Sequence, residues 1–265
     1  FWIKLLKEVP DEDWDIWRMW NTMTDRLPDV GTVAYCESHD QALVGDQTLA
    51  FRLMNKQMYT DMNRAAENLL IDRGMALHKM IRLFTISLAG QAYLNFMGNE
   101  FGHPEWVDFP RAGNGDSFQY CRRQWSLVQN PDLKYQSLAR FDRAMLHLAR
   151  QWDWFRQWMP DLKLVSREQQ VLAFERGGLI FVFNFSPTHS YPNALIPVSQ
   201  GEDHVLLLST DDEAFGGQGR IAPIPYPACM AGHRGNYLQL YLPARTAVVL
   251  APEALGNKIQ APQSH

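Results

Sequence analysis

The sequence predicts an α/β region over residues 1–154, followed by an all-β region over residues 155–265. Two observations carry this prediction. In the first region short apolar segments alternate with helical patterns, which is typical of parallel strands joined by crossover helices. In the second region short strand patterns follow one another closely, which favours a separate antiparallel β-sandwich.

Two apolar runs in the first region are expected to be buried strands, GTVAYC at 31–36 and AYLNFM at 92–97. The spacing of apolar side chains predicts four helices, with Asp72 as the N-cap of the second: 47–62, 72–88, 118–128 and 133–150. Two strand–helix units cannot close a sheet alone. The region is therefore either a small open α/β layer or the tail of a larger barrel.

The second region contains five clear strand patterns, at 171–176, 179–186, 204–209, 236–243 and 245–252. Gly177–Gly178 predicts a tight hairpin between the first two strands. Pro243–Ala244 predicts a further turn between the last two.

Composition excludes several classes of function. Hydrophobic residues make up 46% of the chain, charged residues 20%, and the net charge is -4, so nucleic acid is not an expected partner. There is no apolar run of 18 residues, so we expect no membrane-spanning helix. The first residues turn acidic where a signal peptide needs an apolar core. Three widely spaced cysteines argue against a disulfide framework, and a reducing cytoplasm fits best.

Aromatic residues are frequent, at 12% of the chain with nine tryptophans. Most are expected in the core, although sugar-binding sites also use aromatic faces. Metal binding is not expected, because neither His78 nor the neighbours His103 and Glu105 have a second ligand pair at a convincing spacing. No phosphate-binding loop occurs, and no cofactor is expected.

Polar side chains follow both predicted strands of the first region. His39 and Asp40 come after the first strand, and Glu100, His103 and Trp106 after the second. Reactive groups of a parallel barrel lie just past the carboxyl ends of its strands. A carboxylate and an imidazole there can bond sugar hydroxyls and stabilise a developing positive charge. On spacing alone, the pair could equally cap a turn.

Three long segments resemble the 1,4-α-glucan (glycogen or starch) branching enzymes of the α-amylase superfamily: AYCESHDQALVGD, IDRGMALHKMIRLFTISLAGQAYLNFMGNEFGHPEWVDFPR and VLAFERGGLIFVFNFSP. The resemblance implies the last part of a (β/α)8 TIM barrel followed by an all-β C-terminal domain. Residues 31–36 and 92–97 would be barrel strands seven and eight.

The resemblance also implies roles for individual residues. Asp40 would be the third catalytic carboxylate, which stabilises the transition state, and His39 would bond a hydroxyl of the same sugar. We expect Trp106 either to offer an aromatic face to the substrate or to lie in the core. The implied reaction is a retaining transfer of an α-1,4-glucan chain to a 6-hydroxyl, on glycogen, amylose or starch, without a cofactor.

The resemblance leaves two catalytic groups unplaced. The family carries its nucleophile and its acid/base after strands four and five, and no DGFRFD-like stretch occurs in this chain. The chain alone is thus expected to be inactive, with the N-terminal part of the same enzyme as its partner. Two alternatives stay open: a glucan hydrolase or debranching relative, and a non-catalytic glucan-binding remnant.

Overall fold

The computed structural model describes residues 1–40, 47–105, 107–230 and 235–260. Its helices are α1 (Trp2–Glu8), α2 (Ile16–Thr24), α4 (Leu49–Met54), α5 (Leu69–Leu88), α6 (Ser126–Gln129), α7 (Tyr135–Trp152) and α8 (Glu253–Gln260). Its strands are β1 (Val33–Ala34), β2 (Ala92–Tyr93), β3 (Asp161–Ser166), β4 (Val171–Arg176), β5 (Leu179–Asn184), β6 (Tyr191–Val198), β7 (His204–Ser209), β8 (Ala228–Met230), β9 (Asn236–Leu242) and β10 (Thr246–Pro252). Within these residues, no helix is both long and apolar enough to cross a membrane.

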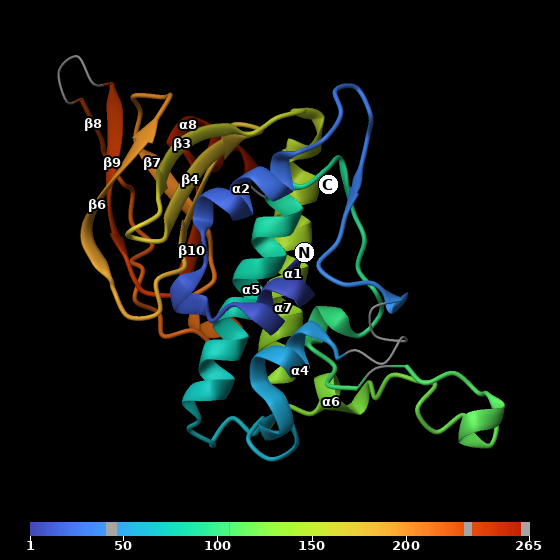
Figure 1. Ribbon diagram of the computed structural model, residues 1–265. Coiled ribbons are helices and arrows are strands. Elements are labelled where there is room, and N and C mark those ends of the chain that lie inside the picture. The colour runs from blue at the N-terminus through green and yellow to red at the C-terminus, as the bar shows by residue number, and fades with distance from the viewer. Residues whose placement is uncertain (41–46, 106, 231–234, 261–265) are drawn as a thin grey trace, which may run out of the picture.

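The second region forms two antiparallel sheets, which confirms the predicted sandwich (Figure 1). One sheet has the order β3-β4-β5-β10-β7 and the other the order β6-β9-β8. The predicted hairpin joins β4 to β5, and Gly177 and Gly178 both take positive φ there, at 61° and 79°. The predicted turn at Pro243–Ala244 also exists. It leads the chain from β9 in one sheet to β10 in the other, through Arg245 at φ 49°.

The five-stranded sheet is covered on both faces. Side chains alternate between the faces of a strand, so Val171 and Ala173 of β4 point at the smaller sheet, while Leu172 and Phe174 point at the helices. The same alternation holds in β5. Because both faces are buried, these strands read as continuous apolar runs, which is why the sequence reveals them.

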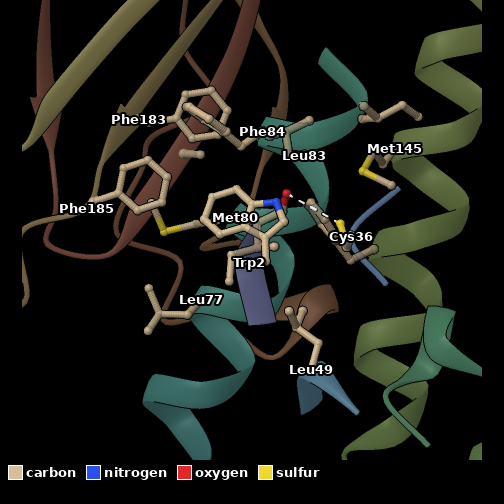
Figure 2. Packing of buried hydrophobic residues seen from close by; sticks show 14 of the residues in the cluster. Trp2, Cys36, Leu49, Leu77, Met80, Leu83, Phe84, Met145, Phe183 and Phe185 are labelled. Atoms are coloured by element: carbon tan, nitrogen blue, oxygen red, sulfur yellow. Dashed lines mark hydrogen bonds between the residues drawn. The ribbon is translucent and has the colours of Figure 1, made fainter. Parts of the chain in front are cut away.

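The helical layer and the sheet share one apolar core. In Figure 2 the ring of Trp2 lies among Phe84 of α5 and Phe183 and Phe185 of the sheet side. Trp2 also donates its indole N–H to Thr85 Oγ1 at 2.8 Å. Aromatic rings in edge contact, such as Phe84 and Phe183 at 5.1 Å, fill this space. Helices α5 and α7 run side by side at its centre (Figure 1).

Helix α5 starts earlier than predicted. Its N-cap is Asn68, whose side-chain oxygen accepts hydrogen bonds from the amides of Leu70 and Ile71 at 2.9 and 3.3 Å. Asp72, predicted as the cap, lies in the first turn instead. The first turn thus begins before the predicted start, and Leu69 within it is 88% exposed.

Four other predicted elements are shorter than expected. The helix predicted at 47–62 is α4 followed by a 3-10 helix at Asn55–Tyr59, and only α6 is helical within 118–128. The predicted strands at 31–36 and 92–97 shrink to β1 and β2. Their predicted burial is only partial: Ala34 is buried, whereas Val33 and Ala92 are exposed, and among the described residues each strand pairs only with the other.

Candidate active site

Strands β1 and β2 are parallel neighbours. Val33 is in register with Ala92, and Ala34 with Tyr93, and the amide of Leu94 donates to Ala34 O at 2.8 Å. Both strands therefore end at the same edge of this small sheet. The segments that follow them, 35–40 and 94–105, emerge from that edge and carry the polar side chains, as the sequence predicts.

His39 and Asp40 form an exposed pair at this edge. His39 Nε2 lies 3.0 Å from Asp40 Oδ1, and the two side chains are 54% and 74% exposed. The imidazole ring lies 5.9 Å from the ring of Phe96, centroid to centroid, so the segment after β2 supports the segment after β1. An accessible carboxylate beside an imidazole can bond hydroxyl groups and stabilise a positive charge.

Unlike His39 and Asp40, Glu37 has a buried side chain. Its Oε2 accepts a hydrogen bond from the amide of Leu49 at 2.7 Å and so holds the start of α4, where Thr48 is the N-cap. Burial raises the pKa of Glu37, and the charges of Arg82 and Arg123 act in the opposite direction. The carboxylate therefore anchors a helix beneath the edge and does not face solvent.

The segment after β2 is held by hydrogen bonds. His103 Nε2 accepts the backbone N–H of Gln124 at 3.1 Å, and Nδ1 lies 3.0 Å from Glu105 O and 3.2 Å from Glu105 N. Burial lowers the pKa of His103, which keeps the ring neutral. Tyr59 donates to Glu105 Oε1 at 2.5 Å, and burial together with this carboxylate raises the pKa of Tyr59 to about 12.

Arg123 is a residue of this site that the sequence did not single out. It is 6% exposed and reaches three acceptors on the segment after β2. Nε donates to Met97 O at 2.7 Å, Nη1 to Glu105 O at 2.5 Å and Nη2 to Asn99 Oδ1 at 3.3 Å. Two of these acceptors are backbone carbonyls, which leave no signature in the sequence.

Two further predictions concern this region. Trp106 lies outside the described residues, so its place relative to His39 and Asp40 is a matter of prediction. Among the residues that the structure describes, no group of three or more His, Cys, Asp and Glu side chains is arranged to hold a metal ion.

The β-sandwich resembles a known domain. Residues 164–253 match the family described as "Alpha amylase, C-terminal all-beta domain". These residues of the β-sandwich therefore resemble that all-β domain.

Over nearly its full length, the chain is similar to 1,4-alpha-glucan-branching enzymes, which confirms the resemblance seen in the sequence. It is 49% identical to the enzyme of Yarrowia lipolytica over 262 residues, or 95% of this chain and 37% of that protein. It is 51% identical to that of Rhizophagus irregularis over 255 residues, 94% of this chain and 37% of that protein. The chain thus spans little more than a third of the curated relatives it matches.

Solved structures show only a weak likeness. An α-amylase from Malbranchea cinnamomea is 17% identical with a TM-score of 0.49, covering 88% of this chain and 38% of that chain. A debranching enzyme from Nostoc punctiforme is 18% identical with a TM-score of 0.49, covering 83% and 35%. Neither likeness is strong enough to contribute to the argument.

Proposed function

We propose that this chain is part of a 1,4-α-glucan branching enzyme, which cleaves an α-1,4-glucan chain and transfers it to a 6-hydroxyl. The observation that carries the proposal is the exposed His39–Asp40 pair at the carboxyl end of β1, in a chain about half identical to branching enzymes. Sugar-processing barrels place reactive groups at this position.

In this proposal β1 and β2 are strands seven and eight of a (β/α)8 barrel. Exposed apolar side chains on and just after these strands support it: Val33 on β1 is 58% exposed, and Leu94 and Met97 after β2 are 45% and 60% exposed. Neighbouring barrel strands from the N-terminal part of the enzyme would cover such side chains. The barrel part would extend over residues 1–154 and the all-β domain over 155–265.

Asp40 is then the carboxylate that stabilises the transition state, and His39 bonds a hydroxyl of the same sugar. A retaining transfer also needs a nucleophile and an acid/base about 5 Å apart. Both would come from the N-terminal part, so this chain contributes one portion of a composite site. Trp106 would add an aromatic face for the glucan. The chemistry requires no metal or cofactor, and the cytoplasm is the proposed location.

Two alternatives differ from this proposal, one in the molecule that accepts the cleaved glucan chain and the other in having no transfer activity. A glucan hydrolase or debranching relative would pass the sugar to water, and a glucan-binding remnant would transfer nothing. The relatives in the comparison are named as branching enzymes at about 50% identity, which favours transfer.

The test uses the complete protein that contains this chain, with amylose as substrate. Loss of iodine colour together with new α-1,6 linkages is expected from the wild type, whereas reducing ends without such linkages would indicate hydrolysis. Asp40→Asn should lower the turnover at least about a hundredfold, because it removes a charge that stabilises the transition state. Asp13→Asn changes an exposed carboxylate of a surface 3-10 helix and should leave turnover unchanged.

The 265 residues by themselves should show no branching. Branching by this chain alone would contradict the composite site, and normal turnover by Asp40→Asn would contradict the role of that carboxylate.

A further inference from the structure

One arginine connects the two halves of the candidate site. Arg123 lies just before α6, outside both segments that carry the polar side chains, yet its guanidinium contacts three points of the segment after β2. The same guanidinium lies 5.0 Å from the centroid of the Phe96 ring. Since Phe96 contacts His39, a continuous path of contacts runs from Arg123 to the His39–Asp40 pair.

The local backbone is shaped around this guanidinium. Gly98 has φ 91°, and a Cβ at that position would lie 2.7 Å from Arg123 Nε. The glycine therefore permits the segment to turn closely around the arginine. Each part of the planar guanidinium is used, because Nε, Nη1 and Nη2 each have a different acceptor. A lysine has a single ammonium group and cannot reach three such separated acceptors.

Two carboxylates face Arg123 beneath the edge. Burial lowers the pKa of Arg123, and the charges of Glu37 and Glu100 act in the opposite direction. Glu37 itself holds α4 through the amide of Leu49. Arg123 thus lies between Glu37, which follows β1, and the backbone of the segment after β2. A change in the position of its guanidinium would displace the Phe96 ring.

We propose that Arg123 is a positioning residue for the glucan transfer, acting through Phe96 to hold His39 and Asp40 in their productive orientation. This inference rests on the proposed function. Arg123 does not touch the substrate in this account. It fixes the distance between the ends of β1 and β2, and misplacement of reacting groups by about 1 Å can lower a rate by about a hundredfold.

The experiment compares Arg123→Gln and Arg123→Lys in the complete protein. Arg122→Gln is the matched control, because Arg122 is the adjacent arginine and is exposed. We expect kcat for branching to fall roughly tenfold to a hundredfold in both Arg123 variants. KM for long amylose should change less than threefold, because most contacts with a long glucan lie away from the cleaved bond. The control should retain wild-type kcat and KM.

A double-mutant cycle with Phe96→Leu tests the path of contacts. If Arg123 acts through Phe96, the double variant should lose about as much kcat as Arg123→Gln alone, and not the product of the two losses. Thermal unfolding of each variant gives the folded fraction, to which every kcat is normalised. Arg123→Lys keeps the positive charge, so it can still be measured if Arg123→Gln fails to fold.

Wild-type kcat in a folded Arg123→Gln variant would overturn the inference, as would independent effects of the two substitutions. These outcomes are distinct from failure of the proposed function. If the proposed function is wrong, the wild type forms no α-1,6 linkages. If only the role of Arg123 is wrong, the wild type is active and Asp40→Asn is inactive.

Discussion

Arg82 of α5 and Asp142 of α7 form an ion pair buried between the two long helices, with side chains 2% and 6% exposed. Arg82 Nε donates to Asp142 Oδ1 at 3.1 Å, and Nη2 reaches the same oxygen. The guanidinium also lies 5.9 Å from the ring of Tyr93 on β2. One residue thereby ties both helices to the strand that precedes the candidate site.

Breaking this pair should destabilise the fold strongly. Arg82→Met leaves the Asp142 carboxylate buried without its partner, so the free energy of unfolding should fall by about 3–5 kcal/mol. Urea denaturation measures the change. The double variant Arg82→Met/Asp142→Leu removes both charges and should be more stable than the single one. A single variant as stable as the wild type would show that the pair is dispensable.

Asp11 should make stability depend on acid pH. Burial acts to raise its pKa, but hydrogen bonds from Arg73 and Arg245, at 2.7 and 2.8 Å, outweigh burial and lower the pKa below 3.8. Since the folded pKa is the lower one, the stabilisation is present above pH 3.8 and is lost as pH falls through the folded value. Asp11→Asn should lower the free energy of unfolding at pH 7 by about 3 kcal/mol.

The acid dependence distinguishes this role from a simple packing defect. Between neutral pH and pH 3, the wild type should lose more stability than Asp11→Asn, as measured by urea unfolding at each pH. Glu12→Gln, at the exposed neighbouring position, is the control and should keep the wild-type dependence. Parallel curves for Asp11→Asn and the wild type would contradict the shifted pKa.

Lys79 should make the free energy of unfolding depend on pH in the alkaline range. Burial lowers its pKa from 10.5 to about 8, although Asp211 and Asp212 oppose the shift, and Nζ donates to Thr210 O at 2.6 Å. Between these two pH values the unfolded chain binds more protons than the folded one. The free energy of unfolding should therefore rise with pH across this window, by up to about 3 kcal/mol.

Lys79→Met removes the titrating group and should abolish this rise. The measurement is chemical denaturation of both proteins at pH 7.5, 9 and 10.5. The difference in unfolding free energy between the two proteins should change in favour of the wild type as pH increases. A difference that stays constant with pH would show that the ammonium is not penalised by burial.

Gly98→Ala should disturb the segment after β2. The backbone there has φ 91°, and the added Cβ would lie 2.7 Å from Arg123 Nε. We expect a loss of about 1–3 kcal/mol in the free energy of unfolding, from backbone strain and steric overlap. Gly31→Ala is the matched control, since nothing lies within 4 Å of a Cβ at that position. Thermal unfolding compares the two, and equal effects would argue against strain at Gly98.

Apolar runs made β4, β5, β7, β9 and β10 predictable, whereas the edge strands β3, β6 and β8 were missed. The run at 179–186 identified β5 because every side chain of that strand is buried. By contrast β6 lies at the edge of the smaller sheet, holds Pro192 and Pro197, and is largely exposed on one side. Prolines and polar residues hide such a strand from a pattern of apolar residues, because an edge position tolerates them.

Some residues of the candidate site could be predicted from the sequence and others could not. His39 and Asp40 were singled out because four polar residues directly follow an apolar run, and the parallel pairing of β1 with β2 brings both polar segments to one edge. Arg123 was not found. It lies 83 residues from Asp40 along the chain, and its main acceptors are carbonyl oxygens that every residue carries.

The sequence by itself determined the order of an α/β region and a β-sandwich, the hairpin at Gly177–Gly178 and the polar ends of two strands. Those features follow from local periodicity and turn chemistry, which each segment carries in its own residues. Only the tertiary structure decided which charges are buried together and which side chains brace His39 and Asp40. Such contacts join residues far apart in the chain, and close packing, which no local pattern encodes, selects them.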